Sequence, residues 1–197
     1  MLDAAGLDVP VGTGISKPLA SRREIWHTGY EGHGILDDKD RMRSIEDFGI
    51  RRDGIELLCE TVYENPGIYI VTIGALTNLA VALKREPGLK DRIERVYSMA
   101  GAIRYPFYVD EENIFEPFAL RRAEFNIACD PLAAKKVFES DLQITMVPLD
   151  VTTKVKISRK QARPLKKKDL VSKYVWNMLE IWLDYIGSER TYLHDPL

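Results

Sequence analysis

Short apolar runs alternate with segments of helical character along most of the chain. Residues 68–73 and 93–99 are rich in residues typical of β-strands, and each run ends close to a glycine. Residues 47–64 and 76–83 carry apolar side chains at helical spacing, and proline with glycine follows each of them. The pattern therefore predicts a repeated unit of strand, tight turn and helix.

The same alternation continues through the second half. Asp130 followed by a proline is typical of a helix start, because a capping carboxylate precedes a residue whose φ angle suits the first helical position. Residues 143–149 read as the next strand, and residues 170–186 carry a continuous apolar stripe at helical spacing. Near the start, the apolar run at residues 9–11 predicts one more short strand that opens into a glycine turn.

Apolar strands that alternate with helices predict an α/β protein with an open, mostly parallel sheet and helices on both faces. We expect residues 1–197 to form a single domain. Ligands of such sheets bind beyond the carboxyl ends of the strands. The positions to search for chemistry are therefore those after Thr13, Ile73, Met99 and Leu149.

Composition narrows the classes of function. The chain has 28 basic and 30 acidic side chains and a net charge of -2, so the charge balance does not indicate nucleic-acid binding. No run approaches the roughly 18 apolar residues of a membrane span, and we expect no membrane partner. Cys59 and Cys129 form neither a disulfide framework nor a metal motif, which favours a reducing, cytoplasmic location.

The strongest candidate for ligand binding is the segment Ala123-Glu124-Phe125-Asn126. If it is extended, Glu124 and Asn126 project to the same side, where a carboxylate and an amide could grip a polyhydroxylated ligand. The alternative is that both side chains merely cap the insert before them and the helix after them. The residues alone leave both interpretations open.

Other candidates are weaker when taken singly. His194 could donate a proton and Asp195 could bind a divalent cation, but His-Asp-Pro is also an ordinary turn. His33 is either a ligand-binding residue or an exposed loop histidine, and Met99 is by default core filler. Motifs of phosphate loops, dinucleotide-binding turns and serine hydrolases do not occur in the sequence.

Four blocks of sequence, taken together, resemble the inosine-uridine preferring nucleoside hydrolases in order and approximate spacing. They comprise residues 73–80, 92–102, 123–131 and 145–152. Shorter matches near both ends extend the likeness over nearly the whole chain. The resemblance implies an open α/β fold that binds a ribonucleoside and a calcium ion, and that hydrolyses the N-glycosidic bond through a ribosyl cation. It also implies a homo-oligomer.

The resemblance also implies roles for individual residues in substrate binding. Glu124 and Asn126 match a pair that holds the ribose, and Met99 matches a residue that packs under the sugar. His33 matches a histidine near the base. His194 matches the imidazole proposed as general acid for the departing base.

Two residues match the family's metal site. Asp195 matches an aspartate that binds the ion and also contacts the sugar hydroxyls, and Ile73 matches the position whose backbone carbonyl coordinates calcium. The family opens with a strand that carries a D-x-D-x-x-x-D-D cluster, and this sequence contains no such cluster. We therefore expect a chain truncated at both ends relative to the family, with an incomplete calcium site and little activity alone. The alternative is a non-catalytic fragment that binds a nucleoside or a partner.

Overall fold

The computed structural model describes residues 1–19, 32–36, 44–104 and 123–195. Most of the insert at 102–122 thus lies outside the described residues. The central sheet has three strands in the order β1-β2-β3, and both neighbouring pairs are parallel. Their bounds are Ile68–Thr72 for β1, Ile93–Met99 for β2 and Ile144–Val147 for β3. The α/β class with a parallel sheet is confirmed, and the carboxyl ends of all three strands lie at the same edge.

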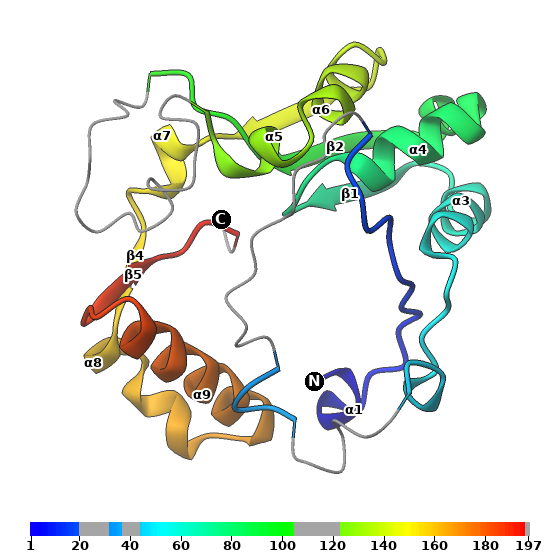
Figure 1. The fold of residues 1–197 in the computed structure, drawn as a ribbon. Helices are drawn as coiled ribbons and strands as arrows, with labels where there is room; N and C mark the ends of the chain where they lie inside the picture. Colours follow the sequence, from blue (N-terminus) through cyan, green and yellow to red (C-terminus); the bar gives the residue numbers. More distant parts are fainter. Residues whose placement is uncertain (20–31, 37–43, 105–122, 196–197) are drawn as a thin grey trace.

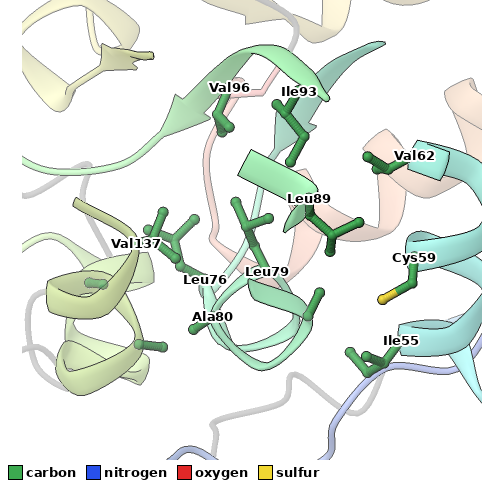
Figure 2. Packing of buried hydrophobic residues seen from close by; sticks show 13 residues of the cluster. Ile55, Cys59, Val62, Leu76, Leu79, Ala80, Leu89, Ile93, Val96 and Val137 are labelled. Carbon is green, nitrogen blue, oxygen red and sulfur yellow. The ribbon is translucent and has the colours of Figure 1, made fainter. Parts of the chain in front are cut away.

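Three helices pack the main core against this sheet. They are α3 (Gly54–Glu64), α4 (Thr77–Arg85) and α6 (Pro131–Phe138), with the short 3-10 helix η2 (Pro87–Asp91) between α4 and β2. Figure 2 shows how their apolar side chains converge, with Leu89 filling the space between α3 and β2. Cys59 is buried in this cluster, as the sequence predicted. The core comprises Ile55, Cys59, Val62, Leu76, Leu79, Ala80, Ala82, Leu89, Ile93, Val96, Ala133, Ala134 and Val137.

The second half of the chain builds a smaller unit around the long helix α9 (Leu170–Tyr185). An antiparallel pair of short strands, β4 (Lys156–Ser158) and β5 (Arg190–Tyr192), flanks it, and the sequence pattern did not predict either strand. Arg159 connects the end of β4 to α9 and to the residue before β5, because its guanidinium forms ion pairs with Glu180, Asp184 and Glu189. This part of the chain also contains the helices α7 (Leu149–Thr152) and α8 (Arg159–Ala162) and the 3-10 helix η3 (Arg163–Lys167). Figure 1 shows this unit on the opposite side of the molecule from α3 and α4.

The strand predicted at residues 9–11 does not form. After α1 (Leu2–Ala5), the chain makes one isolated parallel bridge, between Gly12 and Arg51. Val9 and Val11 are 50% and 39% exposed, so their alternation buries no apolar face against a sheet. Backbone hydrogen bonds instead attach this segment to the chain that leads into α3.

The helix predicted over residues 47–64 begins later than expected. Residues Glu46–Phe48 form the short 3-10 helix η1, and α3 starts at Gly54 because Asp53 caps it by accepting from the backbone N–H of Glu56. Gly54 is close to the backbone of Thr13, where a β-carbon would not fit. None of the helices in the described parts of the chain is long and apolar enough to cross a membrane.

Candidate active site

The carboxyl edge of the sheet brings together the residues that follow the three strands. Ile73 comes directly after β1, Met99 ends β2, and Pro148 leads from β3 into α7. Because β2 lies between β1 and β3, Met99 occupies the middle of this edge. In Figure 1 the C-terminal segment runs from β5 back toward the side of the sheet where α5 and α7 lie.

Glu124 caps a short helix, α5 (Phe125–Cys129), at this edge. Its Oε1 accepts from the backbone N–H of Asn126 at 2.7 Å, and its Oε2 accepts from those of Ile127 and Gly101, both at 3.0 Å. Glu124 is only 4% exposed. The interpretation of 123–126 as extended is therefore wrong, because a carboxylate with free helix N–H groups ahead of it starts a helix. Capping, the alternative that the sequence left open, is what Glu124 does.

Asn126 nevertheless lies close to Glu124, at the end of β2. Its Nδ2 donates to the carbonyl oxygen of Met99 at 2.9 Å and lies 3.3 Å from the sulfur of the same residue. Met99 itself is 7% exposed, so the thioether is packed beneath the amide. Since Nδ2 is engaged by the protein, Oδ1 of Asn126 is the atom that can accept from a ligand.

His194 is held beside α7. Its Nδ1 lies 2.8 Å from Oγ1 of Thr152, and the ring of Tyr192 lies 5.6 Å away between centroids. Burial lowers the pKa of His194, because a charged imidazolium loses solvation there. The neutral imidazole of His194 is thus favoured in the absence of a ligand. Asp195 is exposed, but partial desolvation raises the pKa of its carboxyl group.

The remaining two predicted residues lie on different elements. Ile73 follows β1 with its side chain 56% exposed, which is compatible with a role for its carbonyl alone. His33 lies in the described segment 32–36, which is attached to α9 because Nδ2 of Asn177 donates to the carbonyl of Gly34 at 3.0 Å. That attachment places His33 beside α9, whereas Glu124 and Asn126 are bound to the end of β2.

Two carboxylates shape this edge through contacts that the sequence did not predict. Asp150 of α7 accepts from the backbone N–H groups of Ile103 and Arg104, at 2.8 and 2.7 Å, and these bonds lower the pKa of its carboxyl group. Asp150 therefore fixes the chain where it enters the insert. Its only signal in the sequence was its position directly after a predicted strand.

Asp130 does more than the predicted capping of α6. It accepts from the N–H of Ala133 at 3.0 Å, as expected of a cap, but also from Oγ1 of Thr77 and from the N–H of Leu19. Asp130 is 1% exposed. It thus joins the start of α4, the start of α6 and the N-terminal segment at a single buried point.

The donor chemistry at this edge suits calcium only in part. The carboxylate of Asp195 and the carbonyl of Ile73 are hard oxygen ligands, but a calcium ion takes about 6–8 of them. Within the described ranges, no group of three or more His, Cys, Asp or Glu side chains could hold a metal ion. These residues alone therefore do not fit a complete calcium site. That Asp195 and Ile73 face the same ion stays a prediction.

A sequence profile of the inosine-uridine preferring nucleoside hydrolases matches the chain over residues 1–197. The chain belongs to this family. Among curated relatives, Uridine nucleosidase 1 of Arabidopsis thaliana is 33% identical over 96% of this chain and 55% of that protein. The inosine-uridine preferring nucleoside hydrolase of Crithidia fasciculata is 30% identical over 98% of this chain and 60% of that protein. This nucleoside hydrolase chain therefore spans little more than half the length of these relatives.

Solved structures of nucleoside hydrolases share its fold. A plant nucleoside hydrolase, the PpNRh1 enzyme, superposes with a TM-score of 0.74 at 26% identity, covering 99% of this chain and 60% of that one. A purine-preferring ribonucleoside hydrolase from Gardnerella vaginalis gives a TM-score of 0.73 at 25% identity, covering 99% and 62%. The carboxyl edge described above is thus part of a nucleoside hydrolase fold.

Proposed function

We propose that this chain is the central part of an enzyme that hydrolyses the N-glycosidic bond of ribonucleosides to ribose and free base. The observation that carries the proposal is the convergence of Glu124 and Asn126 on Met99 and Gly101, at the carboxyl end of the middle strand. Ligands of parallel α/β sheets bind at this edge. Membership of the nucleoside hydrolase family supports the choice of ligand.

Glu124 and Asn126 would hold the sugar by accepting from its hydroxyl groups. A carboxylate can accept about four hydrogen bonds, and Glu124 already accepts three from backbone N–H groups. One further hydrogen bond is left for a ribose hydroxyl. Asn126 supplies a second acceptor, its Oδ1, because the hydrogen bond from Nδ2 to the carbonyl of Met99 holds the amide in place. The thioether of Met99 would pack under the sugar.

His194 would donate a proton to the departing base. The departing base leaves with the electron pair of the glycosidic bond, so protonation of its nitrogen lowers the barrier to cleavage. Positioned general acids typically contribute about 10²–10⁴ in rate. The N-glycosidic bond then opens toward a ribosyl cation, whose hydroxyl groups Glu124 and Asn126 keep in place. His33 would lie on the base side of the site.

Calcium, when bound, would supply the activated water, with Asp195 and the carbonyl of Ile73 among its oxygen ligands. Because the described residues do not complete this shell, no step of the reaction is assigned to the ion. Calcium binding by this chain alone should accordingly be weak, which a calorimetric titration would measure.

The test is release of ribose from inosine and from uridine in the presence of calcium. It compares this chain with a version extended upstream through any acidic segment that the reading frame encodes, each as wild type, His194→Gln and His33→Gln. We expect calcium-dependent turnover in the extended form, a loss of about 10²–10⁴-fold in kcat for His194→Gln, and a smaller effect for His33→Gln. Nucleoside binding with no turnover in either form would favour the non-catalytic alternative.

We also infer that the protein acts in the cytoplasm and as a homo-oligomer. Cys59 and Cys129 are not joined by a disulfide, which agrees with a reducing compartment. Relatives are named for uridine and for inosine-uridine specificity, so both a pyrimidine and a purine nucleoside belong in the assay.

A further inference from the structure

A buried hydroxyl of α7 connects the helix to the C-terminal imidazole. Thr152 is 0% exposed, and its Oγ1 lies 2.8 Å from Nδ1 of His194. The hydroxyl of the next residue, Thr153, instead donates to the carbonyl of Leu149 within the same helix, at 2.6 Å. Two adjacent threonines thus use their hydroxyl groups differently, and only the buried one reaches across to the C-terminal segment.

We propose that Thr152 is a positioning residue for His194: it accepts a hydrogen bond from Nδ1–H and so presents Nε2 to the nucleoside. This inference rests on the proposed function, in which His194 protonates the departing base. In that step the Nε2–H bond breaks, the proton moves to a nitrogen of the base, and the electron pair stays on Nε2. The ring is then neutral and carries its remaining proton on Nδ1, where Thr152 still accepts it.

The chemistry of a hydroxyl suits this task. A neutral imidazole exists as two tautomers, and the partner of one ring nitrogen determines which tautomer is populated. Oγ1 of Thr152 has two acceptor lone pairs, so it can accept from Nδ1–H both before and after a proton leaves Nε2. The ring of His194 therefore does not have to turn during proton transfer.

Among the residues that the structure describes, the other contacts around His194 hold its backbone and its ring plane but do not select a nitrogen. The N–H of Leu193 donates to the carbonyl of Val155 at 2.9 Å, which fixes the chain beside β4. Nε1 of Trp182 donates to Oγ1 of Thr191 at 2.9 Å, and Tyr192 packs against the imidazole. A half-turn of the ring about its bond to Cβ would preserve these contacts. The hydrogen bond to Thr152 distinguishes the two orientations.

The experiment reads the tautomer directly by nitrogen-15 NMR of labelled histidines in the 197-residue chain. The sequence contains three histidines, and His194→Gln identifies the signals of His194. At pH about 8.5, well above the ordinary histidine pKa of about 6.5, the ring is neutral and its nitrogen shifts show which atom carries hydrogen. We expect mostly Nδ1–H in the wild type and in Thr152→Ser, and mostly Nε2–H in Thr152→Val. Thr153→Val is the matched control and should keep the wild-type tautomer.

Two results would overturn the role of Thr152: a wild-type ring that is already mostly Nε2–H, or an unchanged tautomer in folded Thr152→Val. The wild-type spectrum tests the proposal even where Thr152→Val does not fold. Because the measurement needs no turnover, a wrong tautomer leaves the proposed hydrolysis untouched. The expected tautomer in a chain whose extended form does not hydrolyse nucleosides would contradict the proposed function and leave the hydrogen-bond assignment standing.

Discussion

Three carboxylates organise the backbone around the candidate site by accepting N–H hydrogen bonds. Glu124 joins the end of β2 to α5, Asp150 holds the entrance to the insert, and Asp130 joins α4, α6 and the N-terminal segment. The sequence predicted one of these contacts, the cap that Asp130 forms on α6, because a cap is local. It did not predict Leu19 or Thr77 as donors to Asp130, since partners distant in sequence leave no local pattern.

Asp130→Ala should destabilise the protein strongly. The substitution leaves the hydroxyl of Thr77 and the N–H groups of Leu19 and Ala133 without their buried acceptor, and unsatisfied buried donors cost about 1–3 kcal/mol each. Because such losses are not additive, we expect a decrease of about 3–5 kcal/mol in the free energy of unfolding. Urea unfolding followed by circular dichroism measures it. Asp53→Ala is the control, since Asp53 is an exposed cap, and an equal decrease there would contradict the account.

Glu124→Gln should lower stability even without any nucleoside present. An amide replaces one accepting oxygen by a donor, so at least one N–H of Gly101, Asn126 or Ile127 faces another donor. We expect the free energy of unfolding to fall by about 2 kcal/mol. Glu94→Gln, at an exposed position of β2, should change it little. If Glu124→Gln were as stable as the wild type, the carboxylate would act on the ligand alone.

At the scale of elements, the sequence predicted those that bury a continuous apolar face. β1, β2 and α4 form close to the predicted bounds and α6 begins where predicted, because apolar side chains of each enter one core. α9 also forms as predicted and buries Trp176 and Leu183. It missed β4 and β5, which have only three residues each and carry Lys156 and Arg190. Strands so short have no detectable period. Their pairing depends on the ion pairs of Arg159 and on α9, which tertiary structure supplies.

The cap of α9 should contribute a pH-dependent part of stability. The backbone N–H and the hydroxyl of Ser172 both donate to Asp169 and lower the pKa of its carboxyl group below its ordinary value. A lowered folded-state pKa means that the contribution is fully present above the unfolded pKa of about 3.9 and is lost as the pH falls through the folded pKa. Asp169→Asn keeps an accepting oxygen but removes this titration.

Unfolding by urea at pH 7 and at several acidic pH values would show the effect. We expect Asp169→Asn to be less stable than the wild type at neutral pH, and the difference to shrink steadily as the pH falls below about 4. Asp91→Asn, at an exposed position in η2, is the matched control. A difference between wild type and Asp169→Asn that stayed constant with pH would show that the cap does not depend on charge.

At the scale of the whole molecule, the described residues leave one face of the central sheet uncovered and both of its outer edges, on β1 and on β3, unpaired. In that part of the chain β1 pairs only with β2, so its other edge is open. Tyr69 and Val71 of β1 are 59% and 68% exposed, and the ring of Tyr97 lies 6.2 Å from that of Tyr69. Open edges that carry apolar side chains are prone to pair with another chain.

We therefore expect this chain to self-associate through β1. Val71→Lys should weaken the association, because a charged side chain at the open edge must be desolvated, and repels its own copy, when two edges approach. Sedimentation velocity over a wide range of protein concentration would measure the change. Val175→Lys places the same substitution at a partly exposed position of α9, where Val175 is 37% exposed, and should leave association unchanged. A wild-type chain that stays monomeric at every concentration, or equal effects of the two lysine variants, would show that β1 is not the contact. Since the relatives are longer than this chain, adding chain that covers β1 should abolish both the association and its sensitivity to Val71.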